Sequence, residues 1–345
     1  MPTQTVSLIS SAATENVAPA ERVEFWEDYN RKVLVGLSCR SYSGQGLRAT
    51  ETNIRLRDVL LADIAGNAHV VERTPAMARS APKDSVFATL LIGGAAAFLH
   101  RNGCAPVAAG NLVIYETRQP YLFGFSSSMR QILVDIPREA FVEACWSGGV
   151  PEPMLFAQES AHEAALLSRL RTLLAGLVAI PGGDRDPEEI QRAVLELLGL
   201  LIVERCGGSI PATAHLIAAK EHIERRLHDP RLDAAEVAGV LGISVRHLAR
   251  AFKTAGTTPT RHILERRLQR ANAQLGAPRA EETRIADVAY RWGFSSQAHF
   301  ARAFHHRFGH TPSEARSIAA ARTAIEGATA RGADNRCVGP AWVDA

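Results

Sequence analysis

Two short stretches near the C-terminus carry side chains that can form specific hydrogen bonds with nucleic-acid bases. The tetrapeptide Ala-Arg-Ala-Phe occupies residues 249–252 and recurs at residues 301–304. Arg246 and Gln297 lie a few residues before the two tetrapeptides. Arginine can donate two hydrogen bonds to the edge of guanine, and glutamine can pair in the same way with adenine. These residue types beside the repeated tetrapeptide indicate a surface that contacts a nucleic acid.

The first stretch is surrounded by signals for two short helices joined by a tight turn. Residues 233–236 (Asp-Ala-Ala-Glu) have the form of a capping box and predict a helix over residues 234–241. Gly242 ends this helix, because glycine adopts the left-handed conformation at little cost. Ser244 is then placed to cap a second helix over residues 245–254.

The second stretch repeats this arrangement. Thr283 is placed to cap a helix over residues 284–292, and Gly293 ends that helix. Ser295 or Ser296 then caps the next helix. Helix, glycine turn and capped second helix are the elements of a helix-turn-helix unit. Two such units are therefore predicted, and aromatic residues at core spacing are expected to be buried in them: Phe252, Trp292, Phe294, Phe300 and Phe304.

The segment between the two units predicts a rigid spacer. A Thr-Pro pair follows each unit, at residues 258–259 and 311–312, and Glu314 completes a capping box after the second pair. Residues 263–275 then predict a helix roughly 20 Å long, at about 1.5 Å per residue. A spacer of this size can place two recognition helices in successive major grooves, which lie about 34 Å apart on one face of DNA.

Residues 230–316 resemble the DNA-binding domain of the AraC/XylS family of transcription regulators. The resemblance is carried by residues 285–289 (Ile-Ala-Asp-Val-Ala), 293–304 (Gly-Phe-Ser-Ser-Gln-Ala-His-Phe-Ala-Arg-Ala-Phe) and 308–312 (Phe-Gly-His-Thr-Pro). The first unit matches the family pattern more loosely.

This resemblance implies base reading by exposed residues of the two recognition helices. By alignment the DNA-binding residues are Arg246, Ala249, Arg250, Gln297, Ala298, His299 and Arg302. Ala249 and Ala298 can offer only methyl contacts. For Arg250 and Arg302, a phosphate contact or a surface salt bridge is the alternative.

The charges of the chain are unevenly divided. Residues 209–320 contain 17 Lys and Arg against 10 Asp and Glu, whereas the rest of the chain has 22 basic and 26 acidic residues. Nine of the 12 histidines also lie in residues 209–320. A net charge of +7 in this part and −4 elsewhere favours a polyanionic partner for the C-terminal part.

The N-terminal half predicts a different structure. A short helix is expected over residues 23–35. Short strands separated by Gly, Asn and Pro turn signals are expected over residues 86–92, 96–100, 112–115, 121–125 and 131–136. Such strands indicate an antiparallel barrel or sandwich. Leucine-rich helices over 162–180 and 188–205 either cover this barrel or form a dimer contact.

Residues 21–160 resemble the effector-binding domain of the same family, in particular that of FeaR-like regulators of aromatic amine and aromatic acid catabolism. The motifs are residues 71–75 (Val-Glu-Arg-Thr-Pro), 106–115, 118–121 (Arg-Gln-Pro-Tyr) and 136–138 (Ile-Pro-Arg), of which the second resembles the glycine turn of cupin-like barrels. The implied fold class is α+β: an N-terminal cupin-like antiparallel β-barrel with a helical dimerisation segment, then an all-α double helix-turn-helix domain.

A small-molecule pocket in such a barrel is expected to be mostly apolar with a few polar anchors. Five residues are candidates for binding an aromatic or carboxylate effector: Trp26, Arg73, Tyr115, Arg118 and Tyr121. A purely structural role is the alternative for each of them.

No catalytic site, metal site or cofactor is predicted, and the protein is not expected to be an enzyme. Cupin enzymes bind a metal with closely spaced histidines and a carboxylate, but the barrel region holds only His69 and His100, which are distant in sequence. The five cysteines are scattered and indicate reduced thiols. Residues 1–16 lack the features of a secretory signal, and no run of about 18 apolar residues occurs, so a cytoplasmic protein is expected.

The predicted organisation follows from these segments. It comprises a flexible arm (1–20), an effector-binding domain (21–160), a helical linker or dimerisation segment (161–208), a DNA-binding domain (209–317) and a flexible tail (318–345). The expected function is that of a transcription regulator. Its expected partners are promoter DNA, a small effector, RNA polymerase and a second copy of the chain. An activator is favoured by the family resemblance. A constitutive DNA-binding dimer without effector, or a cupin-type enzyme fused to a DNA-binding module, are the alternatives.

Overall fold

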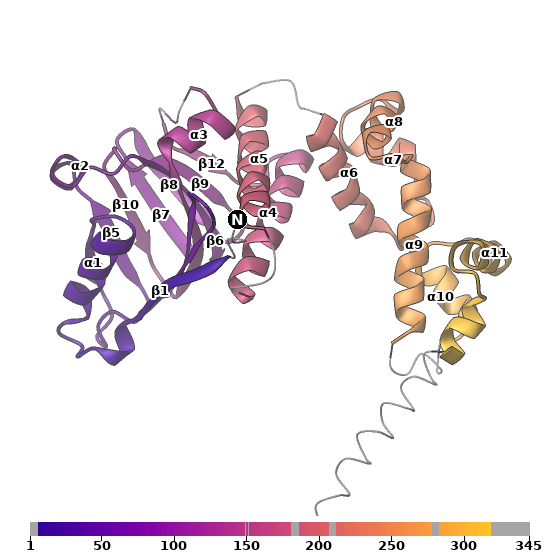
Figure 1. Cartoon of the computed structure of the whole chain (residues 1–345), viewed down its shortest axis with the longest axis horizontal. Helices are drawn as coiled ribbons and strands as arrows, with labels where there is room; N and C mark the ends of the chain where they lie inside the picture. The colour runs from indigo at the N-terminus through magenta and orange to yellow at the C-terminus, as the bar shows by residue number, and fades with distance from the viewer. Residues whose placement is uncertain are drawn as a thin grey trace, which may run out of the picture. The chain divides into compact units, whose positions relative to one another are not determined.

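The chain folds into two compact units, Met1–Ala214 and His215–Ala345, as seen in a computed structural model (Figure 1). The structure describes residues 6–148, 150, 152–180, 186–206, 212–277 and 283–318. The predicted domain boundary after residue 208 and the predicted tail from residue 319 onward lie outside the described residues.

The first unit is built on two antiparallel β-sheets. The seven-stranded sheet has the order β1-β3-β4-β11-β6-β9-β12, and the five-stranded sheet has the order β2-β5-β10-β7-β8. The strands are β1 (Ser7–Ala13), β2 (Ser38–Ser41), β3 (Ala49–Arg55), β4 (Leu60–Gly66), β5 (His69–Arg73), β6 (Ser85–Gly93), β7 (Ala95–His100), β8 (Gly103–Ala108), β9 (Leu112–Glu116), β10 (Tyr121–Phe125), β11 (Met129–Pro137) and β12 (Met154–Phe156).

Both sheets contribute side chains to one shared core. Phe87 of β6 belongs to this core together with Phe98 of β7. In β10, Tyr121, Phe123 and Phe125 are buried and the residues between them are only half-buried, because alternate residues of a strand share a face. The predicted antiparallel arrangement and the five predicted strands are confirmed. The strands form two sheets rather than one closed ring.

The prediction of a flexible arm over residues 1–20 is wrong for the part that the structure describes. Strand β1 pairs with β3, and Ala12 lies opposite Glu51. Just after β1, the Thr14 hydroxyl donates to the backbone carbonyl of Leu47 at 3.0 Å. The residues of β1 are exposed or half-buried, as suits a strand at the edge of a sheet. Their polar composition therefore marks an edge strand.

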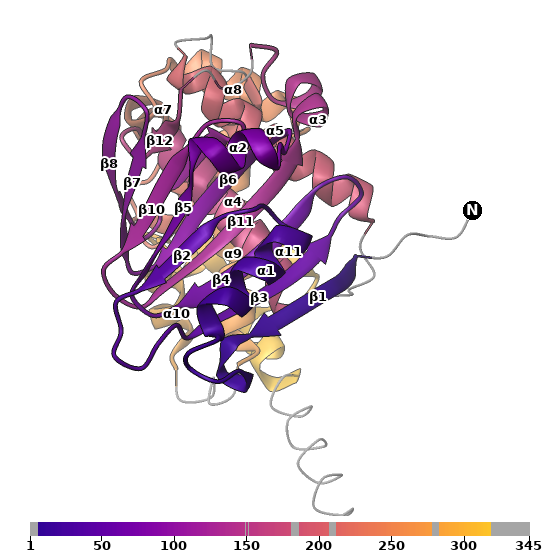
Figure 2. The same cartoon turned by 90° about the vertical axis from the view of Figure 1, so that its left-hand side faces the viewer.

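Five α-helices complete the first unit: α1 (Arg22–Val33), α2 (Pro75–Ser80), α3 (Arg138–Ala144), α4 (Ala161–Ala179) and α5 (Pro187–Arg205). Helix α1 (Figure 2) confirms the helix expected over residues 23–35. Its Tyr29 hydroxyl hydrogen-bonds to Ser10 of β1 at 2.9 Å. Helices α4 and α5 pack against each other beside the seven-stranded sheet (Figure 1). Gln191 of α5 accepts hydrogen bonds from the backbone nitrogens of Asp58 at 2.8 Å and Val59 at 3.1 Å. These contacts support the covering role for this helix pair.

Further along the chain lie helices α6 (Ala212–Arg226), α7 (Ala234–Val240), α8 (Val245–Thr254), α9 (Pro259–Leu275), α10 (Ile285–Arg291) and α11 (Gln297–Phe308). Helices α7 and α8 begin where the sequence predicts. Asp233 caps α7 by accepting from the backbone nitrogen of Glu236 at 2.8 Å, and Ser244 caps α8. The carboxylate of Glu236 contacts His222 of α6 at 3.0 Å. The Glu236 side chain thus joins α7 to α6.

The second helix pair departs from the prediction at one cap. Arg284, without a side-chain cap, directly precedes α10, so Thr283 lies one residue too early to cap this helix. Ser296 is the cap of α11, which settles the choice between two serines. After α11, the backbone nitrogen of Thr311 donates to Glu314 at 2.7 Å, which confirms the predicted capping box.

Helix α9 is the predicted spacer, but it is longer than expected. It begins at Pro259 rather than at residue 263, with Thr258 as its cap. Its 17 residues span about 26 Å at about 1.5 Å per residue. Leu268 and Leu275 of α9 lie in one core cluster with Phe300 of α11. Figure 1 shows α7 and α8 near one end of α9 and α10 and α11 farther along it.

Candidate nucleic-acid interface and ligand cavity

Helix α8 presents its predicted contact residues to solvent. Arg246, Ala249 and Arg250 are exposed. The buried residues Leu248 and Phe252 lie on the other side of the helix and hold it against its neighbours. Within the described residues, neither arginine has a hydrogen-bond or ion-pair partner. Both guanidinium groups are therefore available to an anionic partner.

Helix α11 presents the other four predicted residues, Gln297, Ala298, His299 and Arg302, all of which are exposed. Phe300 and Phe304 are fully buried, and their ring centroids lie 5.4 Å apart. This packing fixes the rotation of α11 about its axis. Arg302 has no ion-pair partner in the described part of the chain, so the surface salt bridge considered as its alternative role is not formed there.

Charged side chains of α9 hold the neighbouring helices in place. Glu224 of α6 accepts hydrogen bonds from Arg266 and, at 2.8 Å, from Arg270. Burial alone would raise the pKa of Glu224, but the two arginines hold it below its usual value. On α11, Arg307 donates to Glu265 of α9 at 2.7 Å. Helix α9 is thus tied to α6 and to the second recognition helix.

The glycine turn between α10 and α11 is packed against the segment that follows α6 and against α9. Gly293 has a φ of +73°. A Cβ at this position would lie 2.8 Å from the carbonyl oxygen of Leu227 and 2.8 Å from Nη2 of Arg267. Arg267 itself donates to the carbonyls of Leu227 at 3.1 Å and Asp229 at 2.6 Å. Both the conformation and the close approach require glycine here.

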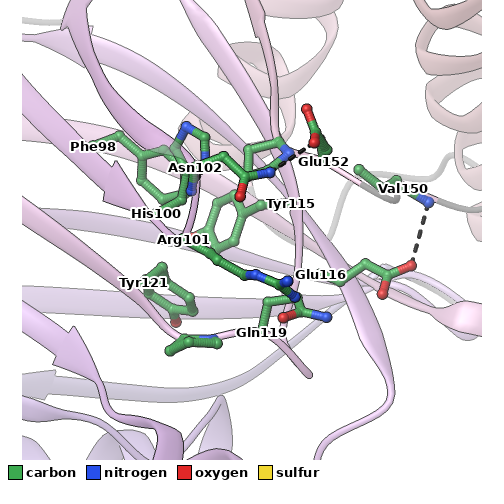
Figure 3. A pocket seen from close by; sticks show the side chains of 12 residues that line it. Phe98, His100, Arg101, Asn102, Tyr115, Glu116, Gln119, Tyr121, Val150 and Glu152 are labelled. Atoms are coloured by element: carbon green, nitrogen blue, oxygen red, sulfur yellow. Dashed lines mark hydrogen bonds between the residues drawn. The ribbon is translucent and has the colours of Figure 1, made fainter.

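Two of the five predicted effector residues meet at a cavity in the first unit. Tyr115 and Tyr121 line a cavity of about 220 Å³ (Figure 3). Their ring centroids lie 4.8 Å apart. Burial raises the pKa of both phenols, so both hydroxyl groups stay protonated near neutral pH.

Arg73 has a structural role. It is fully buried, and its guanidinium donates to the backbone carbonyls of Thr117 at 2.7 Å, Gly36 at 2.7 Å and Ala81 at 2.8 Å. Three separate segments are joined in this way. Because its donors are used by the backbone, the expectation that Arg73 binds an effector is not supported.

Trp26 and Arg118 are also placed away from the cavity. Trp26 is 2 % exposed in the core and lines an internal void of about 30 Å³, space for about one water molecule. Arg118 is exposed and pairs with Asp84 at 2.6 Å. The sequence-predicted set is therefore divided among a core residue, a surface ion pair, a buried backbone anchor and the two cavity tyrosines.

Phe98 and Arg101 are among the cavity-lining residues that the sequence analysis missed. Phe98 is one of the inward residues of the predicted strand over 96–100, and the alternation of that strand is a signal that could have found it. Arg101 lies in the turn after the same strand. No local pattern indicates that this turn borders a cavity, because Val150, Glu152 and Pro153, far along the chain, also line it.

The described residues contain no helix with the length and apolar composition needed to cross a membrane. They also bring together no group of three or more His, Cys, Asp or Glu side chains that could hold a metal ion. His69 is buried with Nδ1 2.6 Å from the carbonyl of Asn67, and His100 stacks on Phe98.

Two family profiles match the chain. Residues 26–203 match an AraC-binding-like domain, and residues 237–318 match a helix-turn-helix domain. Among curated proteins, the transcriptional activator NphR of Rhodococcus sp is 25 % identical over 261 residues, which cover 74 % of this chain and 76 % of that protein. The transcriptional activator RhrA of Rhizobium meliloti is 34 % identical, but the match covers 31 % of this chain and 33 % of RhrA.

Two of the solved structures that match parts of the chain belong to transcription regulators. The AraC-like transcriptional activator CuxR matches 78 % of this chain and 96 % of its own, with 20 % identity and a TM-score of 0.46. A transcriptional regulator from Chromobacterium violaceum with an AraC-type DNA-binding domain matches 31 % of this chain and 92 % of its own, with 34 % identity and a TM-score of 0.29. The AraC-binding-like profile alone spans more than half of the chain. With both domains matched in the expected order, the chain belongs to the AraC/XylS family of transcription regulators.

Proposed function

We propose that this protein is a transcription activator that reads promoter DNA with α8 and α11 and responds to a small molecule bound by its first unit. One observation carries the DNA part of the proposal. Exposed arginine side chains without partners in the described residues stand on two recognition helices, and both helices are packed on the single helix α9.

The recognition residues divide by chemistry. Arg246, Arg250 and Arg302 suit guanine edges, and Gln297 suits adenine. His299 can also donate to a base or a phosphate. Ala249 and Ala298 allow close approach and methyl contacts, so the bases opposite them are read loosely.

The activating role, the effector and the partners are supported by the family and by relatives. NphR and RhrA are both named as transcriptional activators. Activation implies a contact with RNA polymerase, and a bacterial regulator of this kind would act in the cytoplasm. We place self-association, as a homodimer, on the α4–α5 segment. We propose no catalytic activity, because both units match domains of a regulator family.

Selection of bound duplexes from a random DNA pool tests the DNA part directly. Purified full-length protein is expected to enrich a motif with two separated blocks of preferred bases. Enrichment no greater than that of random competitor would overturn the proposal. Genomic footprinting then places the motif beside regulated genes, whose products indicate the class of effector.

The alternative of a constitutive DNA-binding dimer makes a different prediction. It requires the same DNA motif but no ligand that changes affinity for it. Comparing the affinity for the selected duplex with and without candidate ligands separates the two, because a ligand shifts the equilibrium only if it binds the two states differently.

A further inference from the structure

The cavity beside Tyr115 has room for one small organic ligand. Its volume is about 220 Å³, whereas the void deeper between the sheets is about 30 Å³. Buried side chains, many of them aromatic, fill the space around that void. In this conformation, a ligand larger than water fits at the cavity and not between the sheets.

One wall of the cavity consists of three aromatic rings in mutual contact. The centroid of Phe98 lies 5.0 Å from that of Tyr115 and 6.2 Å from that of Tyr121. All three side chains are buried, so their positions are fixed by packing. A flat ring can stack on this wall with little loss of side-chain freedom, since the wall is already ordered.

The carboxylates at the cavity already accept hydrogen bonds from other protein groups (Figure 3). Glu116 accepts hydrogen bonds from Arg138 and, at 3.2 Å, from the backbone nitrogen of Val150. Glu152 accepts from Asn102 at 2.6 Å. A cationic ligand would have to compete with these bonds.

Arg101 differs from the other charged residues of the cavity. It is exposed, and it has no hydrogen-bond or ion-pair partner among the residues that the structure describes. Figure 3 shows its guanidinium beside the side chain of Gln119. A guanidinium can donate two parallel hydrogen bonds to a carboxylate, and a nearby amide can donate a third.

We propose that this cavity binds a small aromatic carboxylate, with its ring on the wall of Phe98, Tyr115 and Tyr121 and its carboxylate on Arg101. The proposal rests on the function proposed above, because such a ligand would be the effector. An aromatic ammonium ion is the alternative that the test must separate, because the carboxylate of Glu152, which accepts a hydrogen bond from the neutral amide of Asn102, also lines the cavity.

The test is isothermal titration of the full-length protein with phenylacetate, and with 2-phenylethylamine as the cation of similar shape. Arg101→Gln removes the charge but keeps a polar side chain. Arg40→Gln is the matched control, because Arg40 is exposed on β2, the far edge strand of the same sheet. Unchanged thermal midpoints verify that both variants fold.

Phenylacetate is expected to bind, and Arg101→Gln to weaken it by about 10- to 100-fold, the usual range for hydrogen bonds to a charged group. Arg40→Gln is expected to leave the affinity within about twofold of wild type. Equal affinities for Arg101→Gln and wild type, tighter binding of the amine, or no binding of phenylacetate at millimolar concentration would each overturn the proposal. A protein that selects a duplex but binds no phenylacetate would lose this inference and keep its DNA-binding function.

Discussion

The roles of individual arginine residues in this chain depend on their hydrogen-bond partners, which the sequence alone does not give. Arg73 and Arg302 both lie within motifs that resemble the family, at residues 71–75 and 293–304. Arg73 is fully buried and bonded to three backbone carbonyls. Arg302 is exposed on α11 and has no partner in the described residues. The first therefore stabilises the fold, and the second is free to contact DNA.

Replacing Arg302 by alanine tests its proposed contact with a base edge. Arg302→Ala is expected to weaken binding to the selected duplex by about 1–3 kcal/mol and to relax the base preference at one position. Arg225→Ala is the control, because Arg225 is exposed on α6 and not on a recognition helix. Fluorescence anisotropy with matched duplexes measures both. Uniform weakening across all sequences would assign Arg302 to a phosphate instead.

A second prediction at this scale concerns the buried carboxyl group of Glu51. Glu51 is 1 % exposed, and burial raises its pKa from 4.5 to about 7, although a hydrogen bond from Asn53 opposes this rise. In the unfolded chain the group ionises near pH 4.5, whereas in the folded protein it stays protonated up to about pH 7. Its contribution to stability is therefore fully present below about pH 4.5 and is lost as the pH rises to 7.

The loss amounts to about 3 kcal/mol at about 1.4 kcal/mol per pKa unit. Glu51→Gln keeps the shape and removes the titration, so the variant is expected to lack this pH dependence. Urea unfolding of both proteins at several pH values between 4.5 and 8 measures the difference. Parallel curves for wild type and variant would show that Glu51 does not titrate in this range.

At the scale of elements, the two glycine turns offer a matched pair of substitutions. Gly242 and Gly293 both have positive φ angles, +64° and +73°. A Cβ at Gly242 would meet nothing within 4 Å, whereas a Cβ at Gly293 would lie 2.8 Å from the carbonyl of Leu227.

Gly242→Ala is expected to cost about 1–2 kcal/mol of stability, the usual penalty of the left-handed conformation. Gly293→Ala is expected to cost more, because the backbone must also shift away from Leu227. Thermal unfolding of the two variants compares them directly. Equal losses would mean that the close approach at Gly293 has no energetic consequence.

The bounds of the helix-turn-helix helices can be predicted to within a few residues, because capping residues and glycines close to each helix end mark them. Asp233, Ser244 and Ser296 each cap the helix that the sequence assigns to them. Strand β1 was missed because its partner β3 lies far along the chain, with Ala12 opposite Glu51. Pairing of this kind leaves no signal within a short window of sequence.

The candidate sites likewise differ in whether a local sequence signal marks them. The recognition-helix residues follow from the family resemblance, which is carried by short continuous stretches of sequence, and all seven are exposed as expected. The cavity residues do not, because the cavity joins two strand ends, a turn and the segment near Val150. Arg73 was misassigned for a related reason, since its carbonyl partners come from three separate segments.

At the scale of the whole molecule, the excess of basic residues and the recognition helices lie in the same part of the chain. Residues 209–320 carry 17 Lys and Arg against 10 Asp and Glu, and the recognition helices lie there. The first unit carries the cavity and the two sheets. This division suits a protein in which one unit binds a polyanion and the other a small ligand.

The central claim is that α8 and α11 both read DNA while α9 holds them at a fixed separation. Methylation interference on the selected duplex with full-length protein tests it most directly. Two blocks of bases whose methylation prevents binding are expected about 10 base pairs apart on one face of the DNA. Arg250→Ala is expected to weaken one block and Arg302→Ala the other. A single block, or one block that both substitutions weaken equally, would contradict the account.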